Sequence, residues 1–205
     1  MNKVASVILS VVVLICLSCT AKREMTLAQY RNYIEAKGGG FCKTVTAGQL
    51  IYTVQYRPPL YIAAAEHQWQ SKDSTEMKTR TIALGGTVWF NVRIGTVSGG
   101  TNPLKSDVSG LAEYNDRLDY WLTQAANDFT LYYGDLELKP QGYVFENSYG
   151  LVPEDVVVIG FRLPDTTPVR PLRLVYEDQL NNSGIIKAEI SMDVLQELDH
   201  IQVKI

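Results

Sequence analysis

The sequence predicts an α+β fold of mostly antiparallel β-sheet, sandwich-like in its C-terminal half, with about three flanking helices. From residue 129 onward, five successive segments alternate apolar and polar residues, with glycine or proline between them. This spacing is typical of antiparallel strands. Before residue 129, helical and alternating patterns are interspersed. No linker-like composition divides the body, so residues 25–205 are expected to form a single domain.

The first predicted helix begins after Thr26, which forms a capping-box pattern with Gln29. It ends at the three glycines 38–40, since glycine is a poor helix former. Two strands are expected around the turn at residues 47–48, and the second covers residues 50–57 with period-two alternation.

Pro58 and Pro59 end that strand, and a helix from Leu60 to about Gln70 is predicted because proline is tolerated in a first helical turn. Ser71–Lys78 is interpreted as a polar loop. The clearest strand follows, with Val88, Phe90, Val92 and Ile94 on one face and Trp89, Asn91 and Arg93 on the other.

A long connection leads to the best helical pattern of the chain, an apolar stripe from Leu111 to Ala125 with Ser109 available as N-cap. The later strands are expected around residues 129–133, 143–145, 157–163, 172–176 and 186–190. Ser191 then caps a short helix, and residues 201–205 alternate as a final strand.

Composition excludes several classes of protein. The 205 residues are 46% hydrophobic and 20% charged, too apolar and too balanced in charge for a disordered chain. Lys and Arg number 19 against 22 Asp and Glu, a net charge of -3 without a basic run. The sequence therefore offers no electrostatic footprint for nucleic acid.

The N-terminus has the pattern of an export signal. Lys3 precedes an apolar run, Val4–Leu17, that is short for a transmembrane helix and fits a signal peptide. Leu17-Ser18-Cys19 resembles a bacterial lipobox, with Cys16 where leucine is usual. This predicts a signal peptide over residues 1–18, a lipidated Cys19 and a tether over residues 19–24. An uncleaved anchor and ordinary signal cleavage are the alternatives.

The lipobox-like start, the early helix, the strand end Gln55-Tyr56-Arg57-Pro58 and the closing unit Leu172–Ile205 resemble uncharacterised envelope lipoproteins of Bacteroidota. The resemblance implies a lipid-anchored protein of the bacterial cell envelope, attached to the outer membrane, and brings no catalytic residues. Asp73-Ser74-Thr75 and Asp165-Thr166-Thr167 look like the O-glycosylation pattern that this phylum uses on exported proteins.

The sequence carries few candidates for chemistry. Cys42 is the one cysteine of the body, so no intrachain disulfide is expected there, and we interpret it as a buried structural residue. His67 and His200 stand apart from cysteines at ligand spacing, so we expect no metal and no cofactor.

Two groups of acidic residues support a hydrolase as the alternative function: Glu66 beside His67, and Glu113, Asp116 and Asp119 spaced three apart on one helix flank. The second group is also what the solvated face of an amphipathic helix looks like, and we favour that interpretation.

The aromatic residues favour binding. Trp89, Asn91 and Arg93 share one strand face, and an aromatic ring beside an amide and a guanidinium can contact a sugar or a protein. If a second layer covers this face, Trp89 belongs to the core. We expect a non-catalytic binding or scaffold module that contacts an envelope protein or a glycan. A purely structural accessory subunit is the third possibility.

Overall fold

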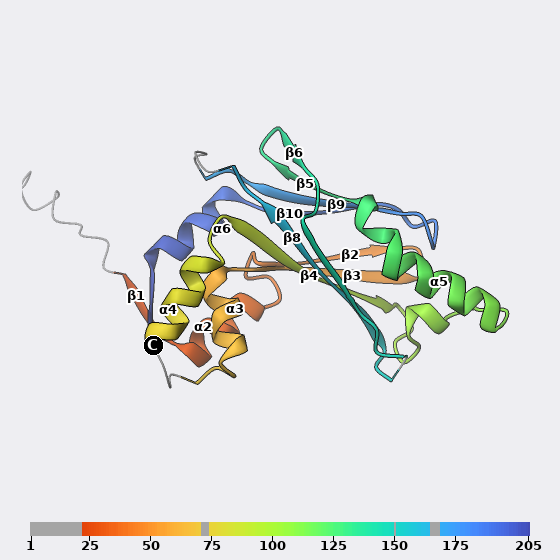
Figure 1. Cartoon of the computed structure of the whole chain (residues 1–205), viewed down its shortest axis with the longest axis horizontal. Helices are drawn as coiled ribbons and strands as arrows, with labels where there is room; N and C mark the ends of the chain where they lie inside the picture. The colour runs from red at the N-terminus through yellow and green to blue at the C-terminus, as the bar shows by residue number, and fades with distance from the viewer. Residues whose placement is uncertain (1–21, 71–73, 150, 165–168) are drawn as a thin grey trace, which may run out of the picture.

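The computed structural model describes residues 22–70, 74–149, 151–164 and 169–205 (Figure 1). The signal segment, Cys19 and Asp165-Thr166-Thr167 lie outside these residues. Within them, five α-helices and eleven strands form mostly antiparallel sheets. The predicted α+β class is therefore confirmed.

The larger sheet has five antiparallel strands in the order β2-β3-β4-β8-β7. They are β2 (Cys42–Ala47), β3 (Leu50–Arg57), β4 (Thr87–Thr96), β8 (Glu154–Arg162) and β7 (Gly142–Glu146). The period-two pattern sets the inner face, because Val88, Phe90, Val92 and Ile94 are all buried.

The second sheet has the order β10-β9-β5-β6. Its strands are β10 (Gly184–Ile190), β9 (Leu172–Asp178), β5 (Phe129–Tyr133) and β6 (Leu136–Leu138). The two inner faces share one apolar core, in which Tyr52 of the first sheet packs against Tyr176 of the second. The sandwich thus draws strands from both halves of the chain.

Three helices gather at one end of the molecule: α2 (Leu27–Glu35), α3 (Pro59–Glu66) and α4 (Ser74–Ala83). A smaller core that includes Ile62, Met77 and Leu84 holds them together. At the same end, β1 (Arg23–Thr26) pairs in parallel with β11 (Ile201–Lys204). The start and the end of the described chain are therefore neighbours.

The opposite end of the long axis carries α5 (Leu111–Thr123), as Figure 1 shows. Trp121 of this helix stacks on Phe145 and lies against Tyr176, so it closes the core between the two sheets. The short α6 (Met192–Glu197) joins β10 to the final strand through a 3₁₀ turn.

The structure corrects the region that was predicted as a loop over Ser71–Lys78. Ser74–Ala83 is helix α4. The sequence hides this helix because Met77 is its one buried residue, so polar side chains cover nearly the whole surface of the element.

Other corrections concern element ends. The helix predicted from Leu60 to Gln70 stops at Glu66, and Gln68 and Trp69 adopt left-handed backbone angles that end it. Gly110, not Ser109, is the N-cap of α5. Arg23 and Glu24, assigned to the tether, belong to β1. The capping box of Thr26 and Gln29 is confirmed.

Among the described helices, none has the length and apolar character required to cross a bilayer.

Candidate functional site

Three connections meet at the α5 end of the sandwich and surround a pocket of about 500 Å³. They are the β2–β3 turn, the β4–α5 connection and the β9–β10 turn. The lining residues are Gly48, Gln49, Leu50, Pro103, Ser106, Asp107, Arg117, Leu180, Asn181, Asn182 and Ser183. A volume of this size suits a small ligand or one or two units of a polymer.

One buried carboxylate, Asp178, shapes the wall that the β9–β10 turn provides. It accepts hydrogen bonds from the backbone N–H groups of Leu180, Asn181 and Ser183 at 3.1–3.2 Å. The Tyr52 hydroxyl donates to the same carboxylate at 2.9 Å from the opposite sheet. Asp178 therefore fixes the turn and also ties it to the core.

A second buried carboxylate, Asp155, holds the β4–α5 connection. Asn102 Nδ2 donates to it at 2.7 Å and the Leu104 backbone N–H at 3.2 Å. Burial raises the pKa of Asp155, and these two hydrogen bonds oppose the rise. Asn102 directly precedes Pro103, so its hydrogen bond to Asp155 of β8 positions that side of the pocket.

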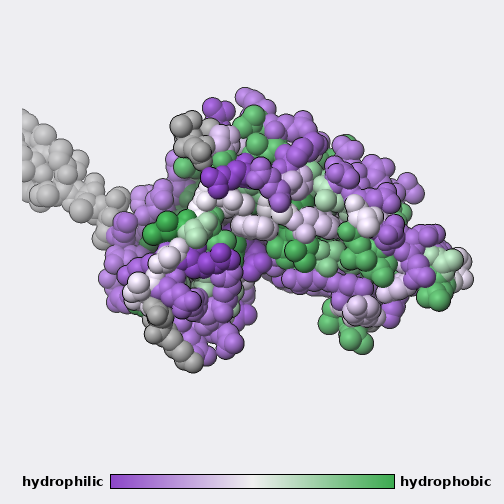
Figure 2. Space-filling view, in the orientation of Figure 1, coloured by the Kyte–Doolittle hydropathy of each residue, from purple (hydrophilic) through white to green (hydrophobic). Residues whose placement is uncertain are grey.

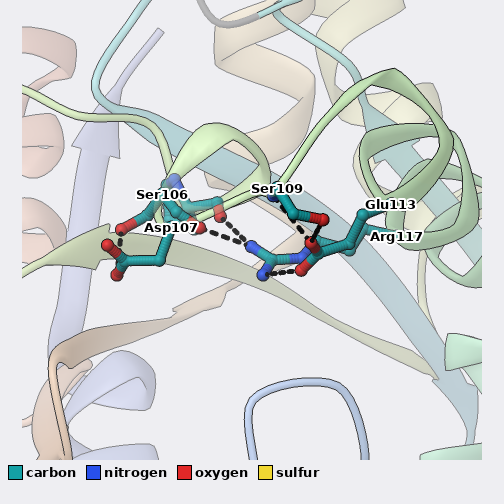
Figure 3. A network of polar contacts seen from close by, with 6 residues as sticks. Ser106, Asp107, Ser109, Glu113 and Arg117 are labelled. Carbon is teal, nitrogen blue, oxygen red and sulfur yellow. Dashed lines mark hydrogen bonds and ion pairs between the residues drawn. The ribbon is translucent and has the colours of Figure 1, made fainter.

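The guanidinium of Arg117 occupies the side of the pocket below α5, where Figure 3 shows it between the connection and the helix. It donates to the carbonyl oxygens of Pro103 and Ser106 and forms an ion pair with Glu113 at 2.6 Å. Glu113 also accepts from the backbone N–H and the hydroxyl of Ser109. The positive charge of Arg117 is thus already neutralised.

The lining that remains free for a ligand is made of amides and hydroxyls. Gln49 and Asn182 offer paired donors and acceptors, and Ser183 offers a hydroxyl. The Asn181 amide donates to Asp178 at 3.2 Å and keeps its oxygen as an acceptor. Asp107 adds a carboxylate, to which the Ser106 hydroxyl donates at 3.1 Å. This chemistry suits a ligand with many hydroxyl or amide groups and no strong negative charge.

The structure also places the predicted patch of Trp89, Asn91 and Arg93. All three lie half-buried on the outer face of the five-stranded sheet. The Trp89 ring covers two glycines of neighbouring strands, because a Cβ on Gly142 or Gly160 would lie 2.6–2.7 Å from it. The Trp89 Nε1–H is buried without an acceptor among the described residues.

The other two patch residues have polar partners. Asn91 Oδ1 accepts from Arg57 at 3.1 Å, so the amide is partly engaged. Arg93 lies 3.8 Å from Glu154 in a loose ion pair, with a side chain that is 36% exposed. The contact patch stays a prediction.

The two glutamates named for the hydrolase alternative are held in ion pairs. Arg80 donates to both oxygens of Glu66 at 2.7 and 2.8 Å, and these hydrogen bonds lower the pKa of Glu66. The Ser109 N–H, the Ser109 hydroxyl and Arg117 lower the pKa of Glu113 to about 2. A general acid needs the opposite shift, toward neutral pH.

The remaining candidates lie apart from the pocket. His67 ends α3, and His200 lies exposed in the turn before β11. Cys42 is buried, and burial raises the pKa of its thiol, as expected of a structural cysteine. In the described part of the chain, no group of three or more His, Cys, Asp or Glu residues could hold a metal ion.

The sequence did not reveal the pocket, because its residues come from three connections far apart in the chain. The one local signal was the polar run Asn181-Asn182-Ser183, which we interpreted only as a turn. Comparison of the chain with family models, curated proteins and solved structures finds no match.

Proposed function

We propose that the protein is a lipid-anchored binding module of the bacterial cell envelope, whose pocket at the α5 end takes a neutral, hydroxyl-rich glycan. The anchoring half of this proposal depends on Leu17-Ser18-Cys19 at the end of the apolar run. The binding half depends on the pocket.

The observation that carries the proposal is the character of the lining. Its amides and hydroxyls can both donate and accept, as sugar hydroxyls require. Its cation, Arg117, is committed to Glu113 and to two backbone carbonyls. A phosphate or sulfate would therefore meet Asp107 without a free cation to offset it.

The location of the pocket also supports the proposal. The pocket lies at the α5 end, whereas β1, which follows the proposed tether, lies at the other end of the long axis (Figure 1). An anchor at one end leaves the pocket facing away from the membrane, where a glycan of the envelope has access to it.

The hydrolase alternative is less well supported. A retaining or inverting glycosidase needs one carboxyl group with a raised pKa. The pKa values of Glu66 and Glu113 are lowered by their partners, and Asp155, whose pKa is raised, is buried and accepts hydrogen bonds from Asn102 and Leu104. We therefore expect the protein to bind its ligand without turnover.

A carbohydrate microarray tests this function. Full-length lipidated protein, solubilised in detergent, is applied to neutral and anionic glycans side by side. We expect retention on neutral glycans. Retention on anionic glycans alone, or on no glycan while crosslinking in the native envelope captures a protein, would overturn the proposal.

A further inference from the structure

The point at which the N-terminal segment meets the body is fixed. Arg23, Glu24, Met25 and Thr26 pair in register with the last strand, residues 201–204. Glu24 also forms an ion pair with Lys204 at 2.6 Å, and Met25 is buried in the core. Strand pairing, the ion pair and the burial of Met25 together hold β1 at the helical end of the molecule.

The same end exposes an unusual side chain on α4. Ile82 is 79% exposed, although aliphatic residues of this size are usually buried. Lys78 lies one turn before it and is also exposed. Helix α4 packs on α3 through its opposite flank, where Met77 is buried. Ile82 and Lys78 therefore face outward together.

Charge is distributed unevenly along the sequence, although both halves of the sequence contribute to each end of the molecule. Basic residues outnumber acidic ones over residues 22–105, and acidic residues outnumber basic ones over residues 106–205. Lys22 and Lys78 have no ion pair among the described residues, and Arg23 lies over the ring of Tyr33. On the face shown in Figure 2 the helical end is largely hydrophilic. Such a surface suits lipid headgroups better than acyl chains.

We infer that the α4 flank of Lys78 and Ile82 lies on a phospholipid bilayer, with Ile82 among the headgroups and Lys78 beside lipid phosphate. This inference rests on the proposed lipid anchor. Three residues lie between Cys19 and Arg23, so the four Cα–Cα steps span at most about 14 Å. The anchor therefore keeps the helical end within reach of a headgroup layer that is roughly 5–7 Å thick.

Site-directed quenching tests the inference on the full-length lipidated protein. A bimane label is placed at Ile82→Cys or at Leu111→Cys, an equally exposed aliphatic position on α5 (74%) at the opposite end, in a Cys42→Ala background. Each protein is reconstituted into phosphatidylethanolamine–phosphatidylglycerol vesicles that contain a headgroup-nitroxide lipid. Circular dichroism of both variants checks that the fold is unchanged.

We expect the label at position 82 to lose most of its fluorescence and the label at position 111 to keep its value in detergent. Replacing phosphatidylglycerol by phosphatidylcholine, or Lys78 by glutamate, is expected to reduce quenching at position 82. Vesicle-bound protein with equal fluorescence at both positions would overturn the inference alone. Protein that does not attach to vesicles would overturn the anchor as well.

Discussion

Asp178 accepts hydrogen bonds from three backbone amides and from the hydroxyl of Tyr52, so one side chain orders the β9–β10 turn and joins it to the core. This geometry explains why residue 178 is an aspartate. Only a carboxylate presents two oxygens that both accept, whereas an amide would turn one donor toward other donors.

Replacing Asp178 by alanine is expected to lower the free energy of unfolding by about 3 kcal/mol, because buried donors lose their acceptor. Asp178→Asn keeps one accepting oxygen and should lose less. Urea denaturation of both variants measures the difference. A loss below about 1 kcal/mol in the alanine variant would mean that the turn is held by other contacts.

A pH titration can test the lowered pKa of Glu113. Its pKa is lowered to about 2 by the Ser109 N–H, the Ser109 hydroxyl and Arg117, so the folded state favours the carboxylate. The contribution to stability is present above the ordinary glutamate pKa and is lost as the pH falls toward 2. NMR titration should find Glu113 ionised at pH 3.

Arg117→Ala should raise the pKa of Glu113 only part of the way, because the Ser109 hydrogen bonds remain. A wild-type Glu113 that titrates near pH 4.5 would show that the contacts drawn in Figure 3 do not persist in solution.

The sequence predicted the positions of the strands more accurately than those of the connections. The alternation through Val88–Ile94 directly encodes which side chains face the core, so β4 was found within two residues of its ends. Helix α4 was missed because Met77 is its one buried residue, so the sequence shows no repeating apolar pattern there. The pocket was missed because Gln49, Ser106 and Asn182 become neighbours only through sheet pairing.

The stacking of Trp89 on two glycine-containing strands is an element-scale prediction. Gly160→Ala places a Cβ 2.7 Å from the ring and should destabilise the fold by about 1–3 kcal/mol. In a Trp89→Ala background the same substitution should cost almost nothing, because the ring is gone. Thermal and urea unfolding measure this double-mutant cycle.

Gly95→Ala is the matched control. Gly95 lies in β4 of the same sheet, and the nearest atom to a Cβ there would be the Cγ of the flexible Glu154 side chain, at an ordinary contact distance of 3.4 Å. If Gly160→Ala is as mild as Gly95→Ala, Trp89 does not pack as described. If the losses in unfolding free energy of Gly160→Ala and Trp89→Ala simply add in the double mutant, the same conclusion follows.

At the scale of the whole molecule, the two ends have different tasks in this account. The helical end holds β1, which follows the proposed tether in sequence, and the α5 end holds the pocket (Figure 1). The core between them joins both sheets, so the ends keep a fixed relation. Anchoring and binding can therefore be tested independently.

The anchor is tested by metabolic labelling with an alkyne fatty acid. Label is expected on the wild type and not on Cys19→Ala, because the thioether and the new N-terminus both require this cysteine. Cys16→Ala serves as the matched control and should label normally. Equal labelling of Cys19→Ala and wild type would exclude Cys19 as the site.

The pocket is tested most directly by calorimetric titration with a neutral glycan selected on the microarray. Gln49→Trp fills the pocket from an exposed turn, whereas Gln202→Trp adds the same ring on β11 at the other end. The account predicts that Gln49→Trp weakens binding about tenfold or more, a loss of at least about 1.4 kcal/mol, while Gln202→Trp binds like the wild type. Undiminished binding by Gln49→Trp would contradict the account.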